Sequence, residues 1–341
     1  MSDAPVPDAR MVRLTRDFWT ATPRWSLRRR LPDGRASDVV GHVLVADESG
    51  VVLLPEDGPA VRVDRADVVA HRVVPPRAVR PASSPEALER IAARGWPGLA
   101  LWRLGGWLLR SGGGYSNRAN SVLVAGDPGL PIAAALEVVA DHYAQLGRPA
   151  IMQLPHAIDA PRVGQDDPTA DVAAAAVAAG WQPYSQTRVL TADLRRLRPE
   201  VAAPGIDAPA ATWSDAPDDA WLHGLHGGQA STDEVARAVI TSAPAEYLTL
   251  RDTGDDPVAI GRLVHTDDWA GLSCIEVAPE QRGRGLGRHI TELMLARART
   301  AVTPARFAYL QVEVDNAPAL ALYNSLGFTD HHDYHYCRLM P

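Results

Sequence analysis

Short runs of alternating hydrophobic and polar residues fill the N-terminal part of the chain. Between residues 24 and 74 these runs have the period of two that is typical of β-strands, and turn residues such as Pro32-Asp-Gly34 separate them. Strands this short and this closely spaced predict a small all-β barrel, and Pro75-Pro76 predicts a linker after it. We therefore expect residues 1–80 to form a separate β domain.

Beyond residue 85, helical and strand patterns alternate, which predicts a mixed α/β fold. The order helix, strand, helix, strand occurs twice. The helix end Ala-Ala-Gly180-Trp181 in the first occurrence matches Ser-Leu-Gly327-Phe328 in the second. We expect an internal duplication of one α/β unit, with a first copy in residues 81–205 and a second in residues 206–341.

A glycine-dense turn, Arg282-Gly-Arg-Gly-Leu-Gly287, lies in the second copy. It follows an apolar strand that ends at Val277 and precedes a helical pattern from about Arg288. Backbone N–H groups in such a turn converge on phosphate oxygens, and the helix N-terminus adds positive charge, so the pattern predicts a phosphate site. A dinucleotide-binding motif would place a third glycine at Arg288. A purely structural turn is the alternative.

The first copy lacks this phosphate loop. The equivalent segment reads Val124-Ala-Gly-Asp-Pro-Gly-Leu-Pro131, in which Asp127 repels phosphate and the two prolines remove N–H donors. We expect one phosphate site per chain.

Composition limits the remaining function classes. No apolar run approaches the roughly 20 residues of a membrane span, and we expect a cytoplasmic protein without membrane contact. The two cysteines, Cys274 and Cys337, do not make a disulfide framework. The net charge is -7, and residues 205–341 alone carry 19 acidic residues against 10 arginines. This balance disfavours nucleic acid as a partner and favours a cationic or amine substrate.

The order of two motifs resembles the GNAT acyl-coenzyme A N-acetyltransferases. The first is R-x-x-G-x-G at residues 282–287, and the second is N-x-x-A-x-x-x-Y-x-x-x-G-F at residues 316–328. With the leading barrel and the segment 102–121, the chain resembles an actinobacterial three-part family. Its members include N-acetylglutamate synthases and a mycobacterial protein described as a histone acetyltransferase. The resemblance implies tandem GNAT-like α/β units after a small Src-homology-3-like barrel, and an acetyl-CoA-dependent N-acetyltransferase.

The same resemblance implies the residues that bind acetyl-CoA. One backbone amide near Val277 is expected to polarise the thioester carbonyl, and the pantetheine arm is expected to enter a gap beside its strand. Asn316 is expected to bind coenzyme A or to cap a helix. The full set of implied contacts is Ile275, Glu276, Val277, Arg282, Gly283, Arg284, Gly285, Leu286, Gly287, Arg288 and Asn316.

Two residues are expected to move protons. Tyr323 stands at the family position for the general acid, and a tyrosine is protonated at neutral pH; a core tyrosine is the alternative. Related peptide N-terminal acetyltransferases place a glutamate base where this chain has Gln311. Glu313 lies two residues further on the same strand face and is the predicted base, with Glu276 or a water chain as alternatives.

The acceptor is expected to sit between the two copies, where Arg110 and Arg118 meet a carboxylate. An α-amine is easier to deprotonate than a lysine amine, so L-glutamate or a similar small α-amino acid is the first expectation. Acetylation of protein or peptide amines, at lysines as in histones or at the N-terminus, is the second. A coenzyme A-binding interaction protein without enzyme activity is the third expectation.

His331, Asp333 and His335 alternate along a strand, and we expect a polar strand face and no metal.

Overall fold

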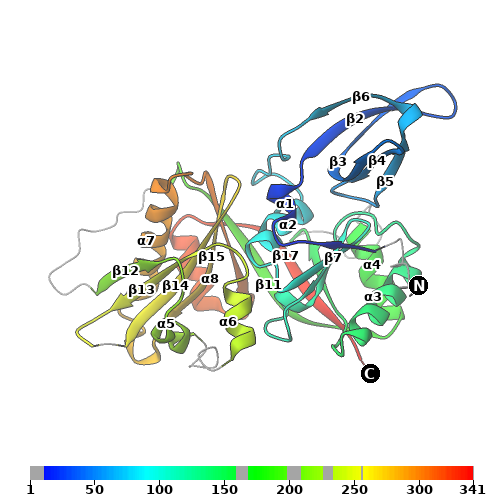
Figure 1. Cartoon of the computed structure of the whole chain (residues 1–341). Helices are drawn as coiled ribbons and strands as arrows, with labels where there is room; N and C mark the ends of the chain where they lie inside the picture. Colours follow the sequence, from blue (N-terminus) through cyan, green and yellow to red (C-terminus); the bar gives the residue numbers. More distant parts are fainter. Residues whose placement is uncertain (1–10, 159–167, 198–208, 226–232, 255, 341) are drawn as a thin grey trace.

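The computed structural model describes residues 11–158, 168–197, 209–225, 233–254 and 256–340. Within these residues, a large twelve-stranded sheet carries helices on its faces, and a five-stranded sheet stands apart from it. Figure 1 shows the small sheet at the upper right, above the half of the molecule that contains α3 (Ile132–Gln145) and α4 (Pro168–Ala178). The mixed α/β architecture with a small N-terminal β domain confirms the predicted fold class.

The small sheet is antiparallel throughout, in the order β5-β4-β3-β2-β6. Its alternating pattern buries Leu27, Val51, Leu53 and Val63 on one face. Closure into a Src-homology-3-like barrel stays a prediction. The elements of this domain are α1 (Phe18–Ala21), β2 (Arg24–Arg30), β3 (Ala36–Asp47), β4 (Gly50–Leu54), β5 (Val61–Asp64), η1 (Arg65–Asp67) and β6 (Val68–Val73).

The large sheet has the order β1-β7-β8-β9-β10-β17-β11-β16-β15-β14-β13-β12 within the described residues. Its first strands along the chain are β1 (Met11–Leu14), β7 (Ala100–Leu104), β8 (Trp107–Ser111), β9 (Val122–Leu123), β10 (Ile151–His156) and β11 (Trp181–Asp193). The later strands are β12 (Ala210–Ser214), β13 (Glu246–Arg251), β14 (Pro257–Thr266), β15 (Trp269–Val277), β16 (Phe307–Glu313) and β17 (Thr329–Leu339).

The two halves of this sheet exchange their last strands. β11 ends the first half of the chain but pairs with β16, and β17 ends the second half but pairs with β10. The exchanged strands pair with each other in the centre. Each half contains one parallel pair, β9 with β10 and β15 with β16, in agreement with the predicted duplication. The halves therefore share one sheet, and the boundary near residue 205 does not separate two sheets. β1, from residues 1–80, also joins it through β7.

Helices cover the sheet and bridge its halves. α2 (Pro85–Gly95), capped by the Ser84 hydroxyl, contacts β10 and β17 on one side and β14 and β15 on the other. α7 (Leu286–Thr300) buries Ile290, Met294 and Leu295 against the second half. The remaining helical elements are η2 (Arg118–Asn120), α5 (Asp219–Gly224), α6 (Glu234–Ile240), η4 (Pro279–Gln281) and α8 (Ala317–Ser325). No helix in the described part of the chain has the length and apolar character of a membrane span.

The loop at the phosphate-loop position of the first half contacts the small β domain. The Asp127 amide donates to the Asp57 carbonyl over 2.8 Å. A Cβ added at Gly126 would lie 2.5 Å from the same carbonyl oxygen, so the two backbones touch. The β4–β5 turn of the small domain therefore covers this loop.

Candidate functional site

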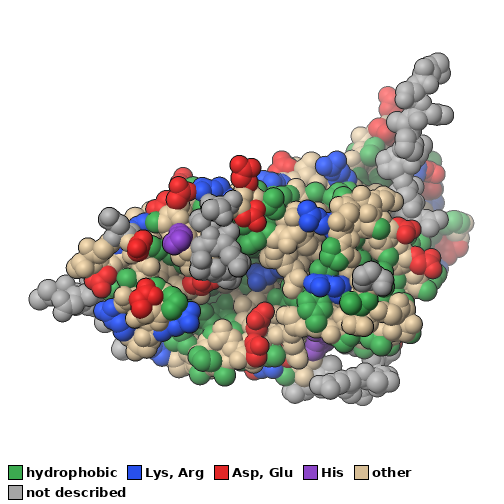
Figure 2. Space-filling model, turned by 90° about the horizontal axis from the view of Figure 1, so that it is seen from below, with side chains coloured by type: hydrophobic (Ala, Val, Ile, Leu, Met, Phe, Trp, Pro, Cys, Tyr) green, Lys and Arg blue, Asp and Glu red, His purple; other side chains and the backbone are tan. Residues whose placement is uncertain are grey.

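A cavity of about 1550 Å³ runs between the two halves of the large sheet. Figure 2 shows the face seen from below hollowed near its middle. The second half contributes β15, the glycine-rich loop, the end of β16 and α8. The first half contributes residues 113–118 together with Trp96, Arg148, Ser185 and Thr187. Of the sequence-predicted site residues, the cavity brings together Arg118, Ile275, Glu276, Val277, Arg282, Gly283, Gly285, Leu286, Gly287, Glu313, Asn316 and Tyr323.

The glycine-rich loop, Arg282–Gly287, has a backbone conformation that suits an anion. Gly283 and Gly285 have φ angles of 78° and 82°, in the left-handed region that favours glycine. Gly285 caps α7 without a side-chain hydrogen bond, which leaves the first N–H groups of the helix free of an intrahelical partner. A Cβ added at either glycine would meet no atom within 4 Å, so open space lies beside both residues. A phosphate-bearing group fits this space and these donors.

The three arginines around the loop have different partners. Arg282 lines the cavity, and its Nε donates to the Val277 carbonyl over 3.3 Å. Arg284 and Arg288 do not line it. Arg284 bonds to Gln281 and lies 3.8 Å from Asp252, and Arg288 donates to the Ser325 hydroxyl over 2.5 Å.

Strands β15 and β16 separate inside the cavity. Their parallel pairing runs from Trp269 with Phe307 to Leu272 with Leu310. Beyond it, the pairing of β15 with β14 shifts register between Ser273 and Glu276 and then resumes at Glu276 and Val277. Cys274 stands at the start of the separation with a φ of 52°, an uncommon backbone conformation for a non-glycine residue. The β15 edge that faces β16 is therefore open to a ligand.

Asn316, the N-cap of α8, and Tyr323, within α8, lie across the gap from β15. Asn316 caps α8, and its Oδ1 accepts a hydrogen bond from the Ala319 amide over 3.2 Å. Tyr323 is 7% exposed, and its hydroxyl has no hydrogen bond to a described residue. Burial raises the pKa of Tyr323 to about 12, so its hydroxyl keeps its proton at neutral pH.

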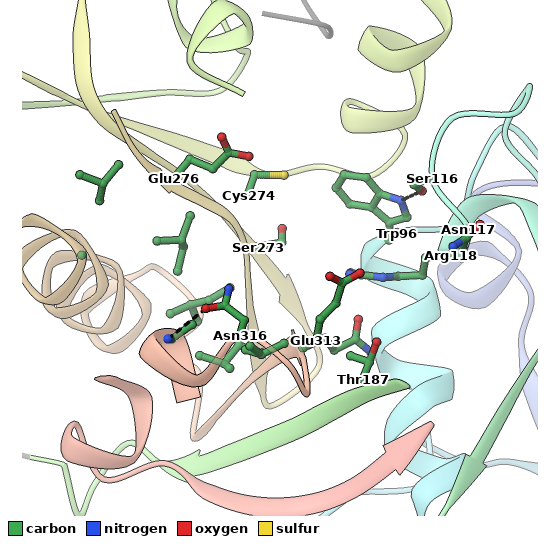
Figure 3. Close-up of a pocket in the computed structure, with 18 of the residues that line it drawn as sticks. Trp96, Ser116, Asn117, Arg118, Thr187, Ser273, Cys274, Glu276, Glu313 and Asn316 are labelled. Atoms are coloured by element: carbon green, nitrogen blue, oxygen red, sulfur yellow. Dashed lines mark hydrogen bonds between the residues drawn. The ribbon is translucent and has the colours of Figure 1, made fainter. Parts of the chain in front are cut away.

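The two candidate carboxylates approach the cavity from opposite strands. Figure 3 shows Glu276 on the same side as Cys274, and Glu313 beside Asn316 on the other side. Glu313 is an exposed side chain at the end of β16, whereas Glu276 is half-buried.

Arg118 reaches the cavity from the first half of the sheet, as Figure 3 shows. Its guanidinium carbon lies 5.6 Å from the centre of the Trp96 ring. Its Nε is buried without a hydrogen-bond partner, and no described carboxylate forms an ion pair with it. Trp96 itself is held by a hydrogen bond from Nε1 to the Ser116 hydroxyl.

Arg110 lies elsewhere. It is fully buried, and it does not line the cavity. Its Nη2 donates to Gln153 Oε1 over 2.6 Å and to the Ser121 hydroxyl over 2.9 Å. Burial lowers the pKa of Arg110. Arg110 is buried because β8 is covered on both faces. The sequence pattern does not reveal this burial.

A buried carboxylate, Glu89 on α2, was not among the predicted site residues. Its Oε1 accepts from Gln311 Nε2 over 2.8 Å and lies 3.2 Å from His332 Nε2, and its Oε2 accepts from Gln153 Nε2 over 2.6 Å. Burial raises its pKa, but the hydrogen bond and charge of His332 and the nearby Arg118 outweigh this effect and hold the pKa below its ordinary value. Glu89 therefore fixes Gln311 at the floor of the cavity. Neither Glu89 nor Trp96 belongs to a recognisable motif.

Among the described residues, no group of three His, Cys, Asp or Glu side chains is arranged as a possible metal site. Asp333, one of the alternating polar residues of β17, instead accepts hydrogen bonds from Gln186 and Arg188.

Comparisons with known proteins identify relatives of this chain. The family model described as "Probable histone acetyltransferase Rv0428c C-terminal" matches residues 83–337. The chain is 31% identical over 329 residues to "Probable histone acetyltransferase Rv0428c" of Mycobacterium tuberculosis, covering 93% of this chain and 94% of that protein. It is 27% identical over 256 residues to "Uncharacterized N-acetyltransferase YobR" of Bacillus subtilis, covering 73% and 96%.

A solved structure shares the fold. It is titled "GCN5-related N-acetyltransferase from Kribbella flavida" and has a TM-score of 0.54 at 16% identity, covering 76% of this chain and 97% of that chain. The likeness shows that the large sheet has the GNAT fold.

Proposed function

Because the chain belongs to the family described as probable histone acetyltransferase Rv0428c C-terminal and is a GNAT-family N-acetyltransferase, we propose that it acetylates the α-amine of a small amino acid. Acetyl-CoA is the proposed donor, and L-glutamate is the first candidate acceptor. Transfer is direct, with both substrates bound together. The observation that carries the proposal is the continuous cavity from the phosphate loop past the β15–β16 gap to Arg118.

The residues of the cavity suit acetyl-CoA. Free N–H groups of the Arg282–Gly287 loop and the start of α7 hold the pyrophosphate, with Arg282 adding positive charge. The open edge from Ile275 to Val277 receives the pantetheine arm as an additional strand would, and an amide near Val277 is directed at the thioester carbonyl. When bound, acetyl-CoA supplies an activated acetyl group. Arg284 and Arg288 are left with a supporting role, since their partners are protein groups.

Proton transfer is assigned to two side chains. Tyr323 is the proton donor to the departing thiolate, because its raised pKa keeps the hydroxyl protonated at neutral pH. Glu313, at the cavity edge, accepts the amine proton directly or through water. Asn316 maintains the first turn of α8 and thereby the position of Tyr323.

The proposed chemical class of the acceptor rests on Arg118. Its buried Nε lacks a partner, and a carboxylate of the acceptor supplies one. Free α-amino acids carry such a carboxylate next to the reacting amine. Deprotonating a lysine amine at pH 7 costs about 4 to 5 kcal/mol, more than a typical α-amine. Arg110 is not part of this assignment, because it does not line the cavity and its Nη2 donates to Gln153 and Ser121.

The test is a comparison of rates at physiological salt, with coenzyme A release measured for free L-glutamate, other amino acids, their amides and lysine-bearing peptides. We expect turnover with free amino acids and a large loss when the α-carboxylate is amidated. Robust acetylation of lysine peptides, with none of free amino acids, would contradict the proposal.

A second candidate is acetylation of protein or peptide amines. It is favoured by the name of the 31%-identical relative and by the excess of acidic residues in residues 205–341, which attracts a basic substrate. Such long-range attraction mainly raises the encounter rate and is screened beyond about 8 Å at physiological salt. The contact-range argument from Arg118 therefore ranks the small amino acid first.

A further inference from the structure

A second, much smaller cavity, of about 60 Å³, lies where the small β domain meets the large sheet. Trp19 and Leu108 form part of its apolar wall. A water needs about 10 to 15 Å³ of such space, so the cavity has room for a few waters or one small oxyanion. Its polar wall contains arginines from four separate segments: Arg24 of β2, Arg77 of the linker, Arg90 and Arg94 of α2, and Arg103 of β7.

The positive charge of this wall is only partly neutralised. Arg94 forms two hydrogen bonds to Asp267, of 2.6 and 3.0 Å, and Arg90 pairs with Asp57 at 3.1 Å. The other three arginines, Arg24, Arg77 and Arg103, form no ion pair with a described residue. Glu56 is the other carboxylate of the wall, and one negative charge does not balance three positive ones.

Arg103 is the most constrained of these arginines. It is 1% exposed. Its Nε donates to the Gly105 carbonyl, and its Nη2 donates to the carbonyls of Pro55 and Glu56, whereas Nη1 has no hydrogen bond to a described residue. Burial and then the charge of Arg90 lower the pKa of Arg103 to about 9. A buried cation that contacts only neutral carbonyls is costly, and an anion beside it would offset that cost.

We propose that this cavity binds a small oxyanion, a phosphate or a carboxylate, and that the anion joins Arg24 and Arg77 to Arg103. Arg24 belongs to the small β domain and Arg103 to the large sheet, so the bound anion holds the two together. None of the arginines that line this cavity lines the acetyl-transfer cavity. The site is therefore independent of the proposed acetyl-transfer reaction.

The experiment measures anion binding to the full chain by isothermal titration calorimetry. Inorganic phosphate and acetate are titrated separately, at constant ionic strength maintained with chloride. Coenzyme A is present at saturation so that the glycine-rich loop is occupied and does not bind phosphate. The variants are Arg24→Ala and Arg77→Ala, because both arginines line the cavity. Arg77 is exposed, so its replacement should leave the fold intact. Arg65→Ala, an exposed arginine of the same domain outside the cavity, is the matched control.

We expect one anion per chain for at least one of the two probes, with affinity reduced about tenfold or more in Arg24→Ala and Arg77→Ala and unchanged in Arg65→Ala. The anion should also raise the melting temperature of the wild type more than that of Arg77→Ala. Binding that is equally strong in wild type, Arg24→Ala and Arg77→Ala would overturn the proposal, as would the absence of saturable binding of both anions to the folded wild type. The relative affinity for phosphate and acetate distinguishes the two kinds of ligand.

Discussion

Leu272 of β15 and Leu310 of β16 form the final pair of the parallel ladder between these two strands. Immediately beyond this pair, Ser273 and Gln311 line the cavity on opposite sides of the gap. The pairing of β15 with β14 is irregular between Ser273 and Glu276 but resumes through Val277, so the gap opens on one edge only. An unpaired strand edge beside the glycine-rich loop suits the proposed extended ligand with phosphates at one end.

Replacement of Gly285 by valine should abolish coenzyme A binding. The left-handed φ of 82° makes any Cβ unfavourable by about 1–2 kcal/mol, and valine would also project into the open space beside the loop. Calorimetry with coenzyme A measures the affinity. Gly34→Val is a matched control, because Gly34 has the same φ and equally open surroundings but lies in the small β domain. Unchanged affinity in a folded Gly285→Val variant would remove the loop from the site.

Replacement of Tyr323 by phenylalanine should keep coenzyme A affinity and lower kcat about 10²-fold, the scale of a general acid. The pH dependence gives a second readout. Because the pKa of Tyr323 is raised to about 12, the acid stays protonated up to that pH, and wild-type kcat should not decline between pH 7 and 10 through loss of this proton. Wild-type turnover in the variant, when chemistry limits the rate, would make Tyr323 a core residue only.

Titration should give one coenzyme A per chain. In the first half, the Asp127 loop contacts the Asp57 carbonyl of the small domain, so it is covered as well as unsuited to phosphate. The single site should disappear in Gly285→Val. Two equivalent sites per chain would show that the first half also binds the cofactor.

Arg118 and Arg110 should respond differently to substitution. Arg118→Met is expected to raise the KM for a free amino acid at least tenfold, because the acceptor carboxylate loses its cation, and to leave the melting temperature close to wild type. Arg110→Met should instead lower the melting temperature, because Gln153 and Ser121 lose a buried donor. Steady-state kinetics and thermal unfolding of both variants distinguish the acceptor-binding role from the structural role. An unchanged KM in Arg118→Met would remove this residue from the acceptor site.

Glu89 should contribute to stability in a pH-dependent manner. Its folded-state pKa lies below the ordinary value, so its contribution is complete above the unfolded-state pKa and is lost as the pH falls through the lower folded-state pKa. Denaturant unfolding at several pH values should show this decline for wild type and a smaller one for Glu89→Gln, which is also less stable at pH 7. Substitution of the exposed Glu48 by glutamine should leave stability at pH 7 unchanged. Identical pH profiles for wild type and Glu89→Gln would refute the charge assignment.

The sequence by itself determined the features that depend on neighbouring residues. The glycines of the phosphate loop, the Asn316 cap and the helix that carries Tyr323 all follow from backbone conformations set within a few positions along the chain. The short strands of the small β domain and the repeated α/β order are likewise local patterns, so the fold class was predictable from them.

The tertiary structure alone decided which distant residues meet. The exchange of β11 and β17 depends on pairing between strands far apart in the chain, which no local pattern encodes. Arg110 and Arg118 look equivalent in the sequence, yet one lies on a strand covered on both faces and the other on a short turn that opens into the cavity. Glu89 lies behind Gln311 of the cavity wall because α2 packs between the two halves, and burial depends on what packs against a residue.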